Sequence, residues 1–64
     1  MYQNRMKQIR KEKGITLNDL SVKTGISIGY LCHLENGTRK NPSMEIMDKV
    51  AIALDKSVFD VFFT

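Results

Sequence analysis

The chain has 64 residues, of which 42% are hydrophobic and 27% are charged. This composition indicates one small folded domain, and it excludes a disordered chain, a membrane-spanning helix and a large enclosed active-site cavity. The net charge of +3 is unevenly placed, with +5 in residues 1–42 and −2 in residues 43–64, which favours one basic face for a polyanion. Because Cys32 is the single cysteine and no apolar signal segment is present, we expect a cytoplasmic location and no membrane partner.

The first predicted helix covers roughly residues 2–13. Tyr2, Met6 and Ile9 recur at helical spacing along this segment, while its basic residues fall on the other side. Gly14 stands where the C-terminal cap of such a helix belongs. The pattern therefore predicts an amphipathic helix with its apolar side in the core.

Residues 16–37 predict a helix, a turn and a second helix. Thr16 can cap the first helix, with Asp19 three residues later to complete a capping box, and Gly25 can end that helix in the left-handed conformation. Ser27 can cap the second helix. Two short helices joined by about three residues form the helix-turn-helix motif, whose second helix lies in the major groove of DNA.

Two more helices are predicted after a polar, basic loop. Either Ser43 or the pair Asn41-Pro42 can start the fourth helix, which is expected to end near residue 54. Its core-facing residues are predicted to be Met44, Met47, Val50, Ala51 and Leu54. Ser57 with Asp60 predicts a capping box for a short fifth helix. The expected fold is all-α, with five helices, no strands and a single domain over residues 1–64.

The segment from Gly14 to Gly37 also resembles a known family. It follows the order G-x-T-x-x-x-L-x-x-x-x-G-(I/V)-S-x-x-Y-(I/L)-x-x-(I/L)-E-N-G of the Cro/C1-type, lambda-repressor-like domains, also called the XRE family. The resemblance continues over nearly all of the chain, and it is especially marked for the N-terminal domains of sporulation-inhibitor-type repressors. It implies a five-helix lambda-repressor-like DNA-binding domain.

The function that this resemblance implies is transcriptional regulation. We expect a repressor of phage or mobile-element type that binds a palindromic operator in double-stranded DNA and needs no cofactor. The alternative is an antitoxin or protein-interaction module that uses the helix-turn-helix only for autoregulation. A disordered or enlarged C-terminal tail would favour the alternative.

The expected base-reading residues lie on the second helix of the motif. Because Leu31 and Leu34 must face the core, four residues are left to face outwards: Ile28, Gly29, Tyr30 and His33. Tyr30 and His33 can form hydrogen bonds with bases, whereas Ile28 offers only apolar contact. The alternative for Ile28 and Tyr30 is that each packs against the preceding helix.

The expected phosphate contacts lie at helix starts and in the basic loop: Thr16, Leu17, Ser27, Arg39, Lys40 and Ser43. Leu17 departs from the family, which commonly has a phosphate-binding Gln there, so only its backbone N–H is available. For Arg39 and Lys40 the alternative is that they are solvated loop charges. The resemblance also implies an ion pair between Arg10 and Glu35.

Three large apolar residues fall off the predicted core stripes: Ile52, Phe59 and Phe63. We expect them to form the interface of a homodimer. The alternative is that Phe63 folds back over the core and that Phe59 covers the first helix.

Nothing in the sequence predicts an enzyme, a metal site or a small-molecule substrate. Cys32 and His33 are neighbours, but successive helical residues point about 100° apart, and two ligands do not complete a tetrahedral site. We expect Cys32 to be a partly buried filler, with a redox-sensing thiol as the alternative.

Overall fold

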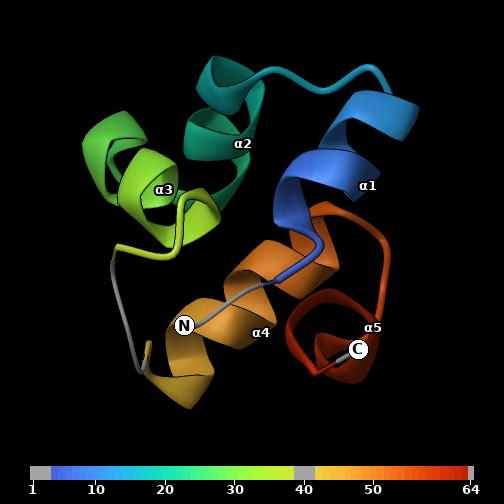
Figure 1. Cartoon of the computed structure of the whole chain (residues 1–64). Helices are drawn as coiled ribbons and strands as arrows, with labels where there is room; N and C mark the ends of the chain where they lie inside the picture. The colour runs from blue at the N-terminus through green and yellow to red at the C-terminus, as the bar shows by residue number, and fades with distance from the viewer. Residues whose placement is uncertain (1–3, 39–41, 64) are drawn as a thin grey trace.

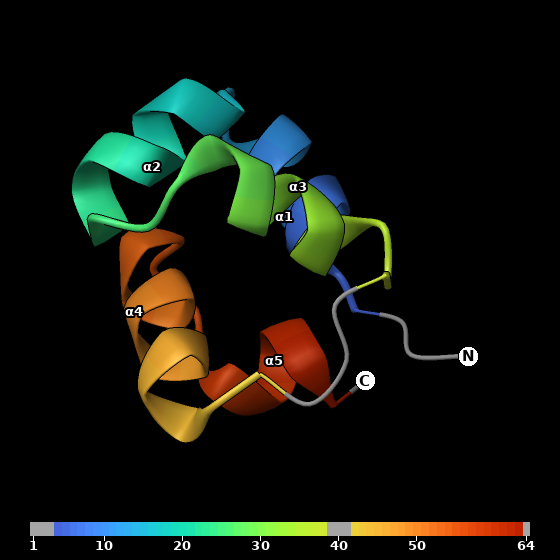
Figure 2. The ribbon, with the colours of Figure 1, turned by 90° about the vertical axis from the view of Figure 1, so that its left-hand side faces the viewer.

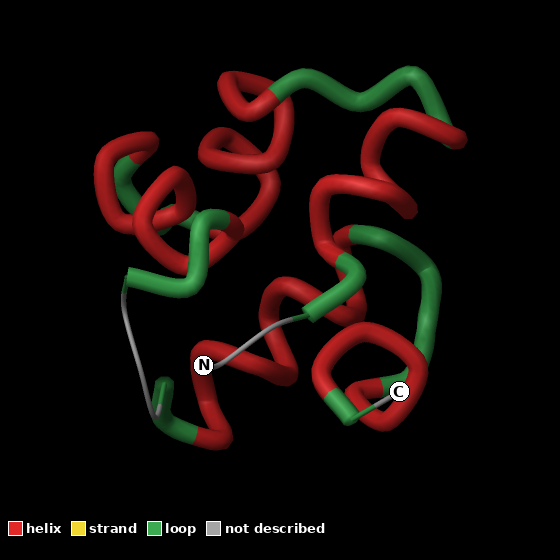
Figure 3. Tube along the Cα trace, viewed as in Figure 1, coloured by secondary structure: helices red, strands yellow, loops and turns green. Residues whose placement is uncertain are grey.

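The computed structural model describes residues 4–38 and 42–63 (Figure 1). Within these ranges it contains five helices and no strand, as the sequence predicts (Figure 3). The helices are α1 (Met6–Glu12), α2 (Leu17–Thr24), α3 (Ile28–Glu35), α4 (Met44–Ala53) and α5 (Val58–Phe62). The predictions that concern Tyr2, Arg39, Lys40 and Asn41 lie outside the described residues. No helix in the described part of the chain is long and apolar enough to cross a bilayer.

Helix α1 begins later than its periodicity predicts. The predicted start near residue 2 was wrong, since Asn4 and Arg5 are not helical and α1 begins at Met6. The Oδ1 atom of Asn4 accepts a hydrogen bond from the Met6 N–H at 2.9 Å, and the Arg5 N–H donates to the Val61 carbonyl at 2.8 Å. The polar partners of these two residues therefore hold the chain outside the helical conformation.

The predicted caps of α2 and α3 are present. The Asp19 N–H donates to Thr16 Oγ1 at 3.0 Å, and the Thr16 N–H donates back to Asp19 Oδ2 at 3.1 Å, which completes the capping box. Gly25 ends α2 with φ of 73°, in the left-handed region where other residues are strained. Ser27 Oγ accepts from the Tyr30 N–H at 3.2 Å and so starts α3. These local bonds fix the turn between the two helices.

Helices α4 and α5 also begin at serine caps. Ser43 Oγ accepts from the Ile46 N–H at 3.2 Å, so Ser43 caps α4, and Pro42 lies before the helix. Ser57 Oγ accepts from the Asp60 N–H at 3.0 Å at the start of α5. A serine in extended conformation satisfies one of the free N–H groups of the first turn, which explains both starts.

The core lies between two layers of helices. In Figures 1 and 2, α4 and α5 form one layer, and α1, α2 and α3 lie across it. Every helix contributes to the core; its largest fully buried side chains are Met6, Ile9, Leu20, Leu31, Leu34, Val50, Leu54 and Val61. Met44 does not belong to it. The prediction that Met44 fills the core was wrong, because its position in the first turn of α4 leaves the side chain 58% exposed.

Candidate nucleic-acid interface

Helix α3 is anchored by one side and exposed on the other. Leu31 and Leu34 are completely buried in the core. On the opposite side, Ile28 is 45% exposed, and Gly29 and His33 are exposed as well. This arrangement presents three of the four predicted base-reading residues to solvent on a helix that cannot shift without disturbing the core.

Tyr30 is the exception among these four residues. It is half-buried and packs against the core, so it is less open to solvent than the other three residues. A tyrosine in this position can bury the ring and still direct its hydroxyl outwards. Tyr30 therefore has a structural role whether or not it contacts a ligand.

His33 contacts the residue that follows the end of the motif. Its Nδ1 atom lies 2.9 Å from Thr38 Oγ1, and the same hydroxyl donates to the His33 carbonyl at 3.1 Å. The Thr38 N–H also donates to the His33 carbonyl, at 3.0 Å. The structure thereby adds Thr38 to the site, a residue that the sequence did not single out because its contact depends on the path of the chain after α3.

The predicted phosphate contacts that the structure describes lie at helix N-termini. Thr16, Ser27 and Ser43 are exposed and cap α2, α3 and α4. The Leu17 side chain packs partly against the core, so that only its backbone is available at the start of α2. Free N–H groups and the positive end of the helix dipole make such termini suitable for anions.

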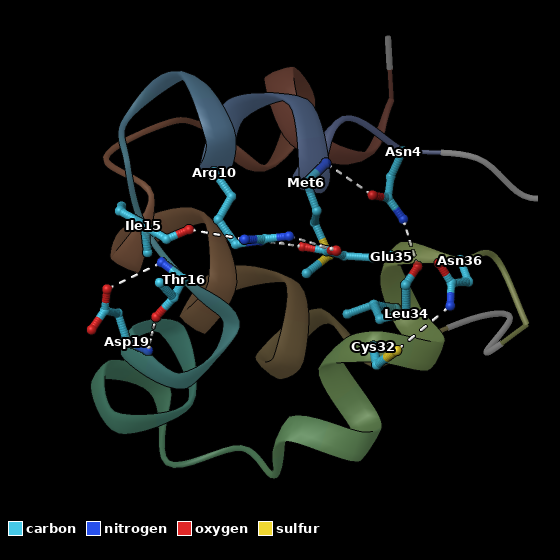
Figure 4. Close-up of polar contacts among 10 residues, drawn as sticks. All are labelled: Asn4, Met6, Arg10, Ile15, Thr16, Asp19, Cys32, Leu34, Glu35 and Asn36. Carbon is cyan, nitrogen blue, oxygen red and sulfur yellow. Dashed lines mark hydrogen bonds and ion pairs between the residues drawn. The ribbon is translucent and has the colours of Figure 1, made fainter.

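The end of α3 is tied to α1 by a charged pair (Figure 4). Arg10 Nε lies 2.7 Å from Glu35 Oε2, and Arg10 Nη2 donates to Glu35 Oε1 at 3.2 Å. The two side chains are only 12% and 4% exposed. The hydrogen bond to Glu35 raises the pKa of Arg10 above the ordinary arginine value. Arg10 Nη1 also donates to the Ile15 carbonyl at 2.9 Å, so the pair connects α1, the next loop and α3.

A second contact to the end of α3 comes from Asn4 (Figure 4). Asn4 Nδ2 donates to the Leu34 carbonyl at 2.9 Å, while its Oδ1 accepts from the Met6 N–H just before α1. Asn side chains often bond to the backbone two residues on, so this local contact was available to sequence reasoning. Its long-range bond was not, because nothing in the local pattern indicates which carbonyl lies nearby.

The remaining predicted sites are placed as follows. Cys32 is half-buried, and its Sγ accepts a 3.5 Å hydrogen bond from Asn36 Nδ2. Within residues 4–38 and 42–63, no group of three His, Cys, Asp or Glu side chains could hold a metal ion.

The three residues predicted for a dimer interface lie on the other layer of the fold. Ile52, Phe59 and Phe63 are 78%, 62% and 57% exposed, so neither phenylalanine is covered as the alternative required.

A capped helix, a left-handed glycine turn and a second helix with one exposed side define a helix-turn-helix protein. Residues 6–61 match the model of the family described as helix-turn-helix, HTH_3, and the chain belongs to this family. Membership agrees with the expectation that the chain is not an enzyme.

The chain is similar to the HTH-type transcriptional regulator SinR of Bacillus subtilis (strain 168). The two are 43% identical over 58 residues, which cover 91% of this chain and 52% of SinR, so the chain spans about half the length of this relative. It is also similar to a crystal structure of SinR, described as the master regulator for biofilm formation, in complex with DNA. That match has a TM-score of 0.79 and 44% identity, and covers 84% of this chain and 86% of the other.

A third similar structure is the SinR protein/SinI protein complex. Its TM-score is 0.80 at 44% identity, and the match covers 86% of this chain and 53% of the other. These likenesses confirm the five-helix, lambda-repressor-like fold.

Proposed function

We propose that this domain binds a specific sequence of double-stranded DNA with α3 in the major groove, as the DNA-binding part of a transcriptional regulator. The observation that carries the proposal is the exposed side of α3, with Ile28, Gly29 and His33, on a fold that SinR has in a crystal with DNA. A recognition helix reads bases with the outward residues of its N-terminal half. The burial of Leu31 and Leu34 would hold those residues in register with the groove.

The residues divide into two roles in this proposal. Ile28, Gly29, Tyr30 and His33 meet base edges, which specify the sequence. The helix N-termini at Thr16, Leu17, Ser27 and Ser43, with Arg39 and Lys40 of the basic loop, bind phosphates and set the orientation. This division is supported by the exposed caps of α2, α3 and α4.

The proposed form on DNA is a homodimer. One small module on one half-site gains too little affinity to compete with the many other sites of a genome. Two copies with a two-fold axis would place their recognition helices about 34 Å apart on a palindromic operator. The exposed Phe59, Phe63 and Ile52 are the apolar side chains that we assign to the interface.

The regulator would act as a repressor by occupying its operator, in the cytoplasm and without a cofactor. The assignment to a phage or mobile-element regulator rests on the resemblance of residues 14–37 to Cro/C1-type repressors alone. Its support is therefore narrower than that for DNA binding, which rests on nearly the whole chain.

Selection of binding sites from random duplex DNA tests the proposal. We expect a consensus with two inverted halves, bound roughly a thousandfold more tightly than a scrambled duplex in fluorescence anisotropy. Ile28→Glu should abolish this preference, because it places a carboxylate against the groove. Val22→Glu is the matched control, since Val22 is an exposed apolar residue of α2, 77% exposed, and the charge change is the same. No enrichment of any sequence would refute the proposal.

The alternative function, a protein-interaction module or antitoxin, is favoured by one observation. A similar chain, SinR, has been crystallised with the SinI protein. A domain with this function would bind its protein partner equally well with Ile28→Glu and wild type. Binding to a protein partner that stays unchanged in Ile28→Glu, while the same substitution abolishes the DNA preference, would assign the domain to this class.

A further inference from the structure

We infer that Thr38 fixes the tautomer of His33, so that His33 presents a hydrogen-bond acceptor to DNA and selects a base with an exocyclic amino group. The part of this inference that concerns DNA rests on the proposed function. Its first part concerns the free protein and follows from three distances between two residues.

The Thr38 hydroxyl has one hydrogen and two neighbours. Its Oγ1 atom lies 3.1 Å from the His33 carbonyl oxygen and 2.9 Å from His33 Nδ1. A carbonyl oxygen only accepts, so the hydroxyl hydrogen must point to it if that contact is a hydrogen bond. The hydroxyl can then only accept from Nδ1, which requires the hydrogen of the ring to be on Nδ1.

The other position of the hydroxyl hydrogen, directed at Nδ1, is less favourable. If the hydroxyl donated to Nδ1, two oxygen atoms would face each other at 3.1 Å with no hydrogen between them. The Thr38 N–H also donates to the His33 carbonyl, at 3.0 Å, but a carbonyl oxygen has two lone pairs and accepts both hydrogens. In the chain of bonds from Nδ1–H to the hydroxyl and on to the carbonyl, every hydrogen therefore has an acceptor.

The consequence lies at the other ring nitrogen. A neutral imidazole with its hydrogen on Nδ1 has a lone pair on Nε2, which then accepts but does not donate. In the major groove, the amino groups of adenine N6 and cytosine N4 donate, whereas guanine N7 and O6 and thymine O4 only accept. His33 of α3, an exposed residue, would thus read adenine or cytosine on the strand it meets.

Thr38 is a positioning residue in this account. Its backbone N–H bond to the His33 carbonyl holds the turn after α3 without help from the hydroxyl. Thr38→Val removes the hydroxyl and keeps the shape, and Thr38→Ser keeps the hydroxyl. The two variants therefore separate the tautomer from the fold.

The first measurement uses the free protein. Long-range proton–nitrogen NMR spectra with the ring neutral distinguish the two tautomers directly. We expect the Nδ1–H form in wild type and Thr38→Ser, and a change to the Nε2–H form, which free histidine prefers, in Thr38→Val. Circular dichroism should show the same fold in all three proteins. A wild-type protein in the Nε2–H form, or no change in Thr38→Val, would overturn the inference whatever the protein does with DNA.

The second measurement uses selection from random duplexes. The base pair that loses its preference in His33→Ala identifies the position of His33. At that pair, wild type and Thr38→Ser should favour adenine or cytosine by about fivefold, as expected for one net hydrogen bond. Thr38→Val should lose this preference or favour guanine or thymine. An unchanged preference in Thr38→Val overturns the base-reading part, whereas a protein that selects no sequence refutes the proposed function and leaves the tautomer result standing.

Discussion

At the scale of single residues, the ion pair between Arg10 and Glu35 is expected to have a large effect on stability. Both side chains are nearly buried, and the 2.7 Å bond replaces their lost hydration. We expect Glu35→Ala to lower the free energy of unfolding by about 3–5 kcal/mol, because Arg10 would keep its buried charge without a partner. Urea denaturation measures the change.

The exposed pair of Glu45 and Lys49 supplies the control for this experiment. Their charged atoms lie 3.5 Å apart with both side chains well exposed, so Glu45→Ala should cost no more than about 0.5 kcal/mol. Replacing Arg10 by Met and Glu35 by Leu together should cost far less than Glu35→Ala alone. Equal, small losses in Glu35→Ala and Glu45→Ala would mean that water reaches the Arg10 pair in solution.

Because of Asp19, we expect the free energy of unfolding to fall at acid pH. The Thr16 N–H, and then the Thr16 hydroxyl, lower the pKa of the Asp19 carboxyl below its ordinary value of 3.8. A lowered pKa in the folded state stabilises the fold above the unfolded value, and this contribution is lost as pH falls from 3.8 through the folded pKa. The melting temperature of wild type should therefore exceed that of Asp19→Asn at pH 7, and the two should converge as pH falls below the lowered pKa of Asp19. Parallel curves at every pH would contradict this expectation.

At the scale of elements, we expect two glycines of the motif to respond in opposite ways to substitution by alanine. Gly25 has φ of 73°, and Gly29 lies in the first turn of α3; a Cβ atom on either would meet nothing within 4 Å. We expect Gly25→Ala to cost about 1 kcal/mol, because only the backbone conformation is strained. Gly29→Ala should instead stabilise the protein by up to about 1 kcal/mol, since alanine favours the helix.

The DNA affinity of Gly29→Ala gives the second half of this test. If Gly29 allows the backbone of α3 to approach the duplex, the variant should melt at a higher temperature and bind the selected duplex more weakly. Anisotropy titrations of Gly29→Ala and wild type measure the difference. A variant that is more stable and binds equally well would show that α3 does not approach DNA closely at this residue.

The helix starts show which elements can be predicted from sequence. A capping serine or threonine acts on N–H groups two or three residues away, so Thr16, Ser27 and Ser57 could be identified from the chain alone. The start of α1 could not, because the Arg5 N–H finds its partner at Val61, which no local pattern indicates.

The candidate site was also only partly predictable, because some of its contacts join residues that are far apart in the sequence. The outward side of α3 followed from the spacing of Leu31 and Leu34, whereas the half-buried state of Tyr30 depends on what the other helices leave uncovered. The Arg10–Glu35 pair came from the resemblance and not from the residues themselves. The contact of His33 with Thr38 needed the path of the backbone after Glu35.

At the scale of the whole molecule, the uneven charge predicts a strong effect of salt. The logarithm of the binding constant should fall linearly with the logarithm of salt concentration, by roughly 0.9 for each phosphate contact. Arg39→Ala and Lys40→Ala should each lower that slope by about 1 and weaken binding to specific and random duplexes alike. Lys49→Ala, on the exposed side of α4, is the control and should change neither. Unchanged slopes in both loop variants would remove the loop from the interface.

Dimerisation is the second prediction at this scale. Phe59 is 62% exposed, so Phe59→Glu should disturb an interface but not the core. We expect wild type to bind a palindromic duplex as two copies in sedimentation experiments, and Phe59→Glu to bind as one copy with lower affinity. Val22→Glu, whose side chain is 77% exposed on α2, should behave as wild type. One copy per duplex for wild type would refute the dimer.

The bond between the Arg5 N–H and the Val61 carbonyl has a consequence for the order of synthesis. A ribosome makes Arg5 early and Val61 only after α4, so α1 has no partner in α5 until translation of the domain is almost finished. Asn4 and Arg10 hold the end of α3 from this same early segment. A nascent chain that has exposed α1 to α3 but not α5 therefore contains the partners that hold the end of α3, but lacks the bond between Arg5 and Val61 that joins α1 to α5. The two layers of helices can be joined in this way only once α5 has left the ribosome.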